Sequence, residues 1–371
     1  MKKISVLIKP SSSLCNIRCK YCFYADVTSL REVCSYGKMK PETTEKMIEH
    51  LFIDLSDGDE LSIGFQGGEP TLAGLSYFKH LITCVQKQTK KVSVHYSIQT
   101  NGILINKKWC EFLKENNFLV GLSIDGTPIL HDMSRLDPRG RGTFQKVIQT
   151  KRLFDDYLID YNVLCVLTQE LAQHAKDIFL FLKQENINYV QFIPCLDELN
   201  PSEKSAYALT PQKFFQFYHD ILPLWLTELA SGHYISIKLF DDIFNLIVRK
   251  EVNACGLVGN CSIQYVIEGD GSVYPCDFFA LDEYRMGFIQ EMGLKELFSS
   301  KIAKQFLYSR PLSKIPSKCT SCPFLNICRG GCKRMKNSMY VDEKSDFCGY
   351  QSFLNEFIPK ITNIMNLINN Y

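Results

Sequence analysis

The spacing of hydrophobic positions changes repeatedly along the first half of the chain. Short apolar runs such as Ile4–Ile8 predict strands, whereas the three-and-four spacing in Pro41–Leu55 predicts a helix with one apolar face. About six such strand–helix units precede Leu196, and this alternation predicts parallel strands with helices packed outside them. The other expected strands are Leu61–Phe65, Val92–Ile98, Phe118–Ile124, Tyr161–Leu167 and Tyr189–Ile193, and the other helices are Tyr77–Val85, Lys107–Lys114, Phe144–Phe154 and Leu171–Lys183.

The number of units limits the possible fold. Right-handed crossovers wind a parallel sheet in one direction, and about six units are too few to close the eight-unit barrel. We therefore predict an α/β fold built on a partial (β/α)6 barrel. The pattern alone leaves a doubly wound open sheet as an alternative.

The residue composition of the chain changes after Leu196, where a polar loop begins. From Cys255 onward the chain is rich in cysteine and in loops. We predict a first domain of residues 1–235 and a second, cysteine-rich domain of residues 236–371. Elements expected here are helices at Pro211–Leu229, Phe240–Val248 and Gln351–Leu367, and a hairpin of Gln264–Ile267 and Ser272–Tyr274.

Composition excludes several classes of function. The 371 residues carry 42 basic and 40 acidic side chains, so no charge excess points to nucleic acid or to an anionic membrane. The sequence has no apolar run long enough for a membrane-spanning helix. The apolar stretch after Met1 is too short for a signal peptide, which favours a cytoplasmic protein.

The sixteen cysteines are the unusual feature of the composition. Cytosolic thiols stay reduced, so clustered cysteines favour metal binding over disulfides. Three lie between residues 15 and 22, and eight lie between 255 and 348. The isolated ones are expected to be small buried hydrophobic residues: Cys34, Cys84, Cys110, Cys165 and Cys195.

Cys15, Cys19 and Cys22 form C-x3-C-x2-C on a loop that directly follows the first strand. A four-iron cluster usually has four thiolate ligands, so three cysteines leave one iron open. The alternative is a structural zinc ion, which needs four ligands, usually from two separated pairs. No fourth cysteine or histidine lies nearby in the sequence, and this favours the iron–sulfur interpretation.

The segment from Cys15 to Cys22 resembles the signature loop of the radical S-adenosylmethionine (SAM) superfamily. Gly67-Gly68-Glu69-Pro70, after the second expected strand, resembles the GGEP motif, which binds the SAM amino group in that superfamily. Glycines allow backbone to approach a ligand, and a carboxylate suits an ammonium group. The resemblance implies that the open iron binds SAM and that a 5′-deoxyadenosyl radical results.

The eight later cysteines resemble the SPASM domain of radical SAM enzymes that modify peptides. This resemblance implies two further four-iron clusters, three in all; two zinc ribbons are the alternative. In the family the two ligand sets interleave. The implied sets are Cys255, Cys261, Cys276 and Cys332 for one cluster, and Cys319, Cys322, Cys328 and Cys348 for the other.

Nearly the whole chain is similar to the anaerobic sulfatase-maturating enzymes, through segments such as Phe65–Thr71, Gln99–Gly102, Val120–Gly126 and Asp270–Phe278. That family oxidises a Cys or Ser in a sulfatase motif to Cα-formylglycine by hydrogen abstraction at Cβ. The resemblance implies a peptide or unfolded protein substrate and an external electron donor such as flavodoxin or ferredoxin. It also implies SAM-binding residues: Tyr21, Gln66, Gly68, Glu69, Gln99, Ser123, Arg135 and Leu196.

Asp277 is the implied catalytic base. After hydrogen abstraction the substrate must lose an electron and a proton, and a carboxylate within hydrogen-bond reach can accept that proton. Asp277 directly follows the expected ligand Cys276, but a turn aspartate is the simpler interpretation. Two other functions stay open: a maturase that crosslinks ribosomal peptides, and a non-catalytic electron carrier or zinc scaffold.

Overall fold

The computed structural model describes residues 1–201, 203–252, 254–308 and 315–369. The described chain forms two compact units, each assembled from separate segments. The first contains the described residues of Met1–Ser123, Arg135–Tyr161 and Ser262–Ser309, and the second contains those of Ile124–Ser134, Asn162–Cys261 and Arg310–Tyr371. The units therefore interleave along the chain, whereas the predicted boundary at 235/236 is a division by consecutive sequence and stays a prediction.

The first unit is built on parallel strands whose carboxyl ends lie at one edge of the sheet. Strand β1 (Lys3–Ile8) pairs with β3 (Glu60–Phe65), β3 with β4 (Ser93–Thr100), and β4 with β5 (Leu119–Ser123). The loops that follow these strands therefore meet at the same edge. The strands are accompanied by helices α1 (Phe23–Ser29), α2 (Pro41–Ile53), α3 (Leu75–Gln86), α4 (Lys107–Glu115) and α6 (Phe144–Asp156).

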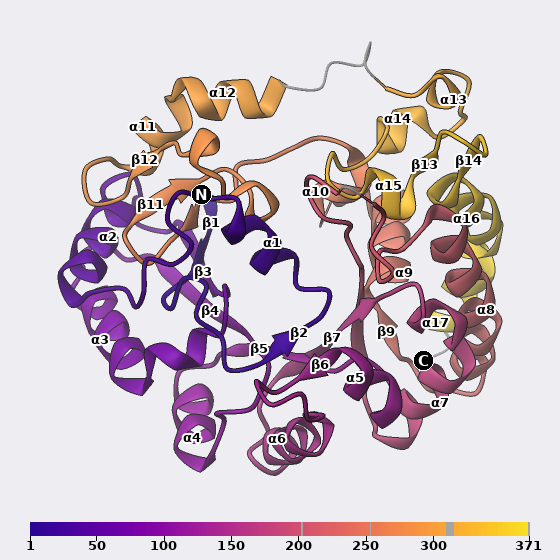
Figure 1. Ribbon diagram of the computed structural model, residues 1–371, viewed down its shortest axis with the longest axis horizontal. Coiled ribbons are helices and arrows are strands. Elements are labelled where there is room, and N and C mark those ends of the chain that lie inside the picture. Colours follow the sequence, from indigo (N-terminus) through magenta and orange to yellow (C-terminus); the bar gives the residue numbers. More distant parts are fainter. Residues whose placement is uncertain (202, 253, 309–314, 370–371) are drawn as a thin grey trace. The chain divides into compact units, whose positions relative to one another are not determined.

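Aromatic side chains form the core between this sheet and its helices. Phe78 of α3 is fully buried, and its ring lies 4.9 Å from that of Phe65 and 5.3 Å from that of Trp109, centroid to centroid. Figure 1 shows α2, α3 and α4 along one side of β1, β3 and β4. The apolar face of each helix thus covers the sheet, as the hydrophobic spacing predicts.

A hairpin from late in the sequence extends this sheet. Strand β10 (Val266–Ile267) pairs parallel with β1 and antiparallel with β11 (Ser272–Tyr274), which pairs with β12 (Gly287–Phe288). The hairpin itself is confirmed, and its position beside β1 is new. Turns η4 (Asp277–Phe279) and η5 (Asp282–Tyr284) and helices α11 (Leu294–Ser299) and α12 (Lys301–Tyr308) complete the unit.

The second unit contains the remaining parallel strands and a group of helices. Strand β8 (Tyr189–Pro194) pairs with β7 (Tyr161–Leu167) and with β9 (Ser236–Ile237). Helix α8 (Pro211–Ala230) is its longest element and contacts α16 (Gly349–Phe357). The other elements are α5 (Pro128–Ser134), η2 (Leu171–Gln173), α7 (Ala175–Gln184), α9 (Lys238–Phe244), the π-helix η3 (Asn245–Arg249), α10 (Cys255–Val258), α13 (Ser317–Thr320), α14 (Leu325–Cys328), α15 (Lys336–Met339), β13 (Val341–Asp342), β14 (Phe347–Cys348), η7 (Ile358–Lys360) and α17 (Ile361–Asn369).

Strand order supports the barrel type of winding over the doubly wound alternative. The strands follow one another in chain order, β1-β3-β4-β5 in the first unit and β7-β8 in the second. A doubly wound sheet would reverse its order at a switch point. The predicted α/β class is confirmed. In the described residues, no helix is both long and apolar enough to cross a membrane.

Two helix predictions were wrong in detail. The expected single helix Gln351–Leu367 is interrupted by the turn η7, which contains Pro359. Proline lacks a backbone donor and clashes with the preceding turn, so it divides the helix there. The expected helix Leu171–Lys183 likewise begins as a 3-10 turn, and α7 starts only at Ala175.

Candidate functional site

The three-cysteine loop begins where β1 ends. Cys15, Cys19 and Cys22 are all half-buried. Cys19 belongs to the short strand β2 (Arg18–Cys19), which pairs antiparallel with β6 (Arg135–Leu136). The Cys22 backbone N–H donates to the Cys19 carbonyl over 3.3 Å, and α1 starts at the next residue. The C-x3-C-x2-C spacing is therefore folded into one tight loop anchored at both ends.

The glycine motif after β3 docks directly on this loop. The backbone N–H of Gly68 donates to the Ser12 carbonyl, and that of Glu69 donates to the Leu14 carbonyl, both over 2.8 Å. A Cβ atom at Gly68 would lie 2.1 Å from the Leu14 oxygen. Only glycine allows this approach, so the two motifs that are separate in the sequence form one structural element.

The Glu69 carboxylate is buried and accepts several hydrogen bonds. Its donors are the Thr71 backbone N–H (3.1 Å) and hydroxyl (2.6 Å), the Thr100 hydroxyl (2.7 Å) and the Asn101 backbone N–H (2.8 Å). Burial raises the pKa of Glu69, and the donors oppose that rise. In this structure the carboxylate ties the loop after β3 to the loop after β4. Its contact with the SAM amino group stays a prediction.

Asn101 connects the same loops to the first cysteine. Its side-chain amide donates to Asn16 Oδ1 over 2.8 Å and to Cys15 Sγ over 3.8 Å. Hydrogen bonds to the sulfurs of an iron–sulfur cluster help to set its reduction potential. Sequence reasoning included Asn101 in a family segment but gave it no role, although a polar residue directly after a parallel strand was a usable signal.

Most of the other predicted SAM residues lie in the first unit. Tyr21 accepts a hydrogen bond from the Arg135 guanidinium over 2.9 Å, and Arg135 is buried. Ser123 ends β5 and is buried, whereas Gln66 and Gln99 are half-buried at or near the ends of β3 and β4. Leu196 belongs to the second unit, where it follows β8 and is half-buried.

Asp277 lies beside the end of β1. Its carboxylate forms an ion pair with the ammonium group of Lys9, the first residue after that strand. The Lys9 side chain is only 1% exposed and lies over the Tyr24 ring, 3.3 Å from its centroid. The Asp277 side chain keeps 11% exposure. The predicted base is therefore held beside Lys9, at the point where β1 ends and the segment that leads to the three cysteines begins.

A second buried ion pair stabilises this region. Glu268 pairs with Arg31 over 2.8 Å, and it accepts hydrogen bonds from the hydroxyls of Ser12 (3.0 Å) and Tyr24. Burial and the Glu268 charge raise the pKa of Tyr24, so the phenol stays protonated and donates. Sequence reasoning missed Lys9, Arg31 and Glu268, because nothing local marks a lysine after a strand or a glutamate in a turn as buried.

The cysteines of the second predicted auxiliary set converge in the second unit. Cys319, Cys322, Cys328 and Cys348 line one small cavity, together with Tyr340 and Tyr350 among others. Burial, followed by the charges of the neighbouring cysteines, raises the pKa of Cys348 to about 11. Four crowded thiols cannot all ionise unless a cation compensates them, which is the environment of a metal site.

The cysteines of the first predicted auxiliary set are divided between the two units, so neither unit by itself shows whether they bind one cluster. Cys276 lies in the first unit, two residues after the end of β11, whereas Cys255, Cys261 and Cys332 lie in the second. All four are half-buried. Their assignment to one cluster stays a prediction.

Substitution of Gly68 tests the docking of the two loops. In Gly68→Ala the new methyl group would collide with the Leu14 carbonyl, so we expect SAM affinity to fall about tenfold or more. Equilibrium dialysis with labelled SAM measures this. Gly58→Asn is the control, because Gly58 has open space around it and a backbone conformation that asparagine tolerates. Unchanged affinity in Gly68→Ala would refute the docking argument.

Substitution of Asn101 tests the hydrogen bond to Cys15. Removal of a donor to a cluster sulfur destabilises the reduced state, so Asn101→Ala should lower the midpoint potential of the N-terminal cluster by roughly 40 mV. Redox titration followed by electron paramagnetic resonance measures the shift. Asn116→Ala, which removes an amide at the end of α4, should leave the potential unchanged. Equal potentials in the two variants would contradict the assignment.

The comparisons with known proteins agree with this geometry. Residues 10–182 match the model of the radical SAM superfamily, and residues 255–323 match that of an iron-sulfur cluster-binding domain. A cysteine-type anaerobic sulfatase-maturating enzyme of Clostridium novyi is 41% identical over 98% of this chain and 97% of its own length. A serine-type enzyme of Bacteroides thetaiotaomicron is 28% identical over 92% of this chain and 85% of its own length.

A solved structure gives the same result. That of anSMEcpe with bound AdoMet and the Cp18Cys peptide is 37% identical, covers 99% of both chains and superposes with a TM-score of 0.89. The predicted radical SAM and SPASM assignments and the cofactors, SAM and [4Fe-4S] clusters, are confirmed at the level of the family. By its cysteine loop, its fold and these relatives, the chain belongs to the anaerobic sulfatase-maturating enzymes of the radical SAM superfamily.

Proposed function

We propose that this protein oxidises the cysteine of a C-x-P-x-R peptide segment to Cα-formylglycine. Family membership supports the reaction. The higher identity to the cysteine-type relative, 41% against 28% for the serine-type one, supports cysteine as the preferred residue. The observation that carries the proposal is the ion pair that holds Asp277 against Lys9, at the root of the three-cysteine loop.

The overall reaction defines what the protein must do. Oxidation of a cysteine side chain removes one hydrogen atom from Cβ, one proton from the thiol and one electron. The resulting thioaldehyde reacts with water to give the aldehyde and hydrogen sulfide. When bound, SAM and the iron–sulfur clusters supply the hydrogen-atom abstraction and the electron transfers.

Asp277 accepts the thiol proton in this proposal. Its carboxylate lies beside the buried Lys9 ammonium, and its partial exposure leaves room for a substrate thiol to approach. Lys9 is itself fixed over the Tyr24 ring. Lys9 is therefore a positioning residue: it orients the base and compensates its charge, and it does not touch the reacting atoms.

The remaining predicted residues have binding roles. Cys15, Cys19 and Cys22 bind the cluster that holds SAM, and the two interleaved sets of four cysteines bind the auxiliary clusters. Arg135 suits the SAM carboxylate because guanidinium binds carboxylate in a bidentate manner. The proposed SAM contacts are Tyr21, Gln66, Gly68, Glu69, Gln99, Ser123, Arg135 and Leu196.

The proposal extends to the cellular setting. A peptide or unfolded sulfatase segment is the substrate, and a flavodoxin or ferredoxin supplies the electron that starts each turnover. A cytoplasmic location suits both this donor and reduced thiols. Residues 1–235 carry SAM binding in this scheme, and residues 236–371 carry the auxiliary clusters.

A peptide assay tests the reaction. A synthetic peptide containing C-x-P-x-R, incubated with reconstituted enzyme, SAM and reductant, should yield the aldehyde by mass spectrometry. Asp277→Asn should slow aldehyde formation by about 10² to 10⁴, the usual contribution of a general base, while 5′-deoxyadenosine release continues. Asp160→Asn, at an exposed carboxylate, is the control and should match the wild type.

Two outcomes would contradict the proposal. Unmodified peptide beside vigorous SAM cleavage would favour the crosslinking alternative. Full aldehyde formation by Asp277→Asn would remove Asp277 from the mechanism.

A double-mutant cycle tests the role of Lys9. Lys9→Met keeps an apolar chain over Tyr24 but removes the charge that Asp277 faces, so we expect aldehyde formation to fall about tenfold. If Lys9 acts only through Asp277, the variant Lys9→Met/Asp277→Asn should be no slower than Asp277→Asn alone. Multiplicative losses, measured as initial rates at saturating peptide, would show that Lys9 acts independently.

A further inference from the structure

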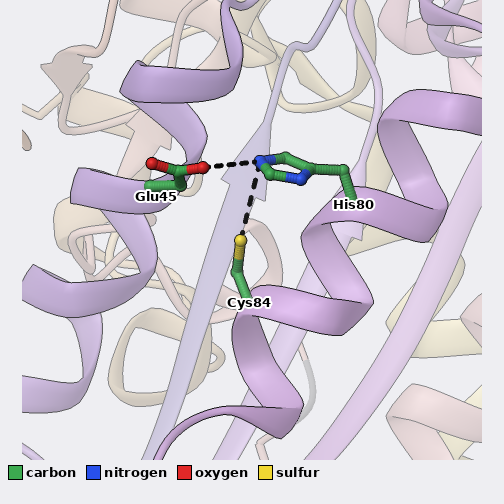
Figure 2. Close-up of side chains that lie close together, drawn as sticks. All are labelled: Glu45, His80 and Cys84. Atoms are coloured by element: carbon green, nitrogen blue, oxygen red, sulfur yellow. Dashed lines mark hydrogen bonds and ion pairs between the residues drawn. The ribbon is translucent and has the colours of Figure 1, made fainter.

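Three metal-binding side chains converge on the outer side of the first unit, on helices that the reaction does not use. His80 and Cys84 lie one turn apart on α3, so they share a face, and Glu45 reaches towards them from α2. Figure 2 shows the carboxylate and the sulfur on either side of one imidazole nitrogen. His80 Nε2 lies 3.3 Å from Glu45 Oε1 and 3.7 Å from Cys84 Sγ.

These separations match those around a tetrahedral ion. With zinc bonds of about 2.0 Å to nitrogen and oxygen and about 2.3 Å to sulfur, the expected nitrogen–oxygen and nitrogen–sulfur separations are about 3.3 Å and about 3.5 Å. All three ligand atoms of the cluster lie within 4.8 Å of one another. In the described part of the chain, no other three such side chains meet this condition.

One hydrogen bond cannot satisfy both neighbours of His80 Nε2 at full strength. The same nitrogen, Nε2, faces both the carboxylate and the thiol, and one ring nitrogen carries at most one proton. A relay from cysteine through histidine to glutamate would use both ring nitrogens. Three donor atoms of metal-binding type within 4.8 Å of one another also suit the coordination of a single ion.

The local charge also suits a dication. Glu45 contributes a carboxylate 3.3 Å from His80 Nε2, and Cys84 contributes a thiol that can bind a metal ion as a thiolate. With a divalent cation bound, the thiolate and the Glu45 carboxylate together balance its two positive charges.

We propose that Glu45, His80 and Cys84 bind one Zn²⁺, with water as the fourth ligand, and that the ion links α2 to α3. Imidazole, thiolate and carboxylate together form a zinc-type donor set. Glu45 and His80 are 53% and 33% exposed, so the ion can enter from solvent without opening the fold. The site is separate from the cysteines of the iron–sulfur clusters.

Metal analysis of the cluster-loaded enzyme tests the proposal. Reconstituted protein is equilibrated with micromolar zinc in anaerobic, chelator-free buffer, and zinc and iron are measured after desalting. We expect one zinc per chain beyond the cluster iron. His80→Gln and Cys84→Ser should bind it about tenfold more weakly or worse, with iron unchanged. His95→Gln, at an exposed histidine outside the site, should behave as the wild type.

Thiol protection provides a second measurement that does not depend on a variant folding. In the wild-type holoenzyme, zinc should slow alkylation of Cys84, followed by peptide mass spectrometry, and should leave the alkylation of exposed Cys34 unchanged. Zinc binding by His80→Gln and Cys84→Ser that equals that of the wild type, or alkylation of Cys84 that zinc does not affect, would overturn the proposal.

Discussion

Two backbone hydrogen bonds between the loop after β1 and the loop after β3 are the constraint on which the site depends. They join the N–H groups of Gly68 and Glu69 to the carbonyls of Ser12 and Leu14. Because no side chain fits between these backbones, the cysteine loop is held in one position against the sheet. Glu69 then links this pair of loops to the loop after β4, and Asn101 of that loop contacts the first cysteine sulfur.

Buried ion pairs hold other segments in place on the other side of β1. Lys9, Asp277, Arg31 and Glu268 are all buried, and unpaired charges would be costly there. They are satisfied as two ion pairs, joined through Tyr24, which donates to Glu268 and underlies Lys9. The arrangement fixes the residue after Cys276 relative to a loop more than 250 positions earlier in the chain. A carboxylate held in this way needs no rearrangement before it accepts a proton.

Local features of the sequence predicted much of this structure. Parallel strands, their helices and the three-cysteine loop follow from hydrophobic period and residue spacing, so Cys15–Cys22 and Gly67–Pro70 could be identified without coordinates. Pro359 was a local signal that the last helix is interrupted, although the apolar spacing on both sides of it predicted one continuous helix.

Long-range pairing could not be predicted in the same way. Strand β10 pairs with the edge of β1, and this pairing brings Asp277 to Lys9. No local sequence pattern in either segment predicts which strand it will pair with. Cys84 is buried as expected, but only the packing of α2 against α3 brings Glu45 and His80 near it. Cys34, which was also expected to be buried, is exposed. The composition of the chain likewise could not predict that the two units are assembled from alternating segments.

The central claim is that the loop of Cys15, Cys19 and Cys22 gives its cluster three protein ligands and leaves one iron for SAM. Electron–nuclear double resonance on the reduced enzyme, with SAM carrying ¹⁵N in its amino group, tests this most directly. The account predicts a ¹⁵N hyperfine coupling to one cluster, lost when Cys19→Ala removes a ligand. A reduced cluster at this loop with no coupling to the label, or a zinc ion in its place, would contradict it.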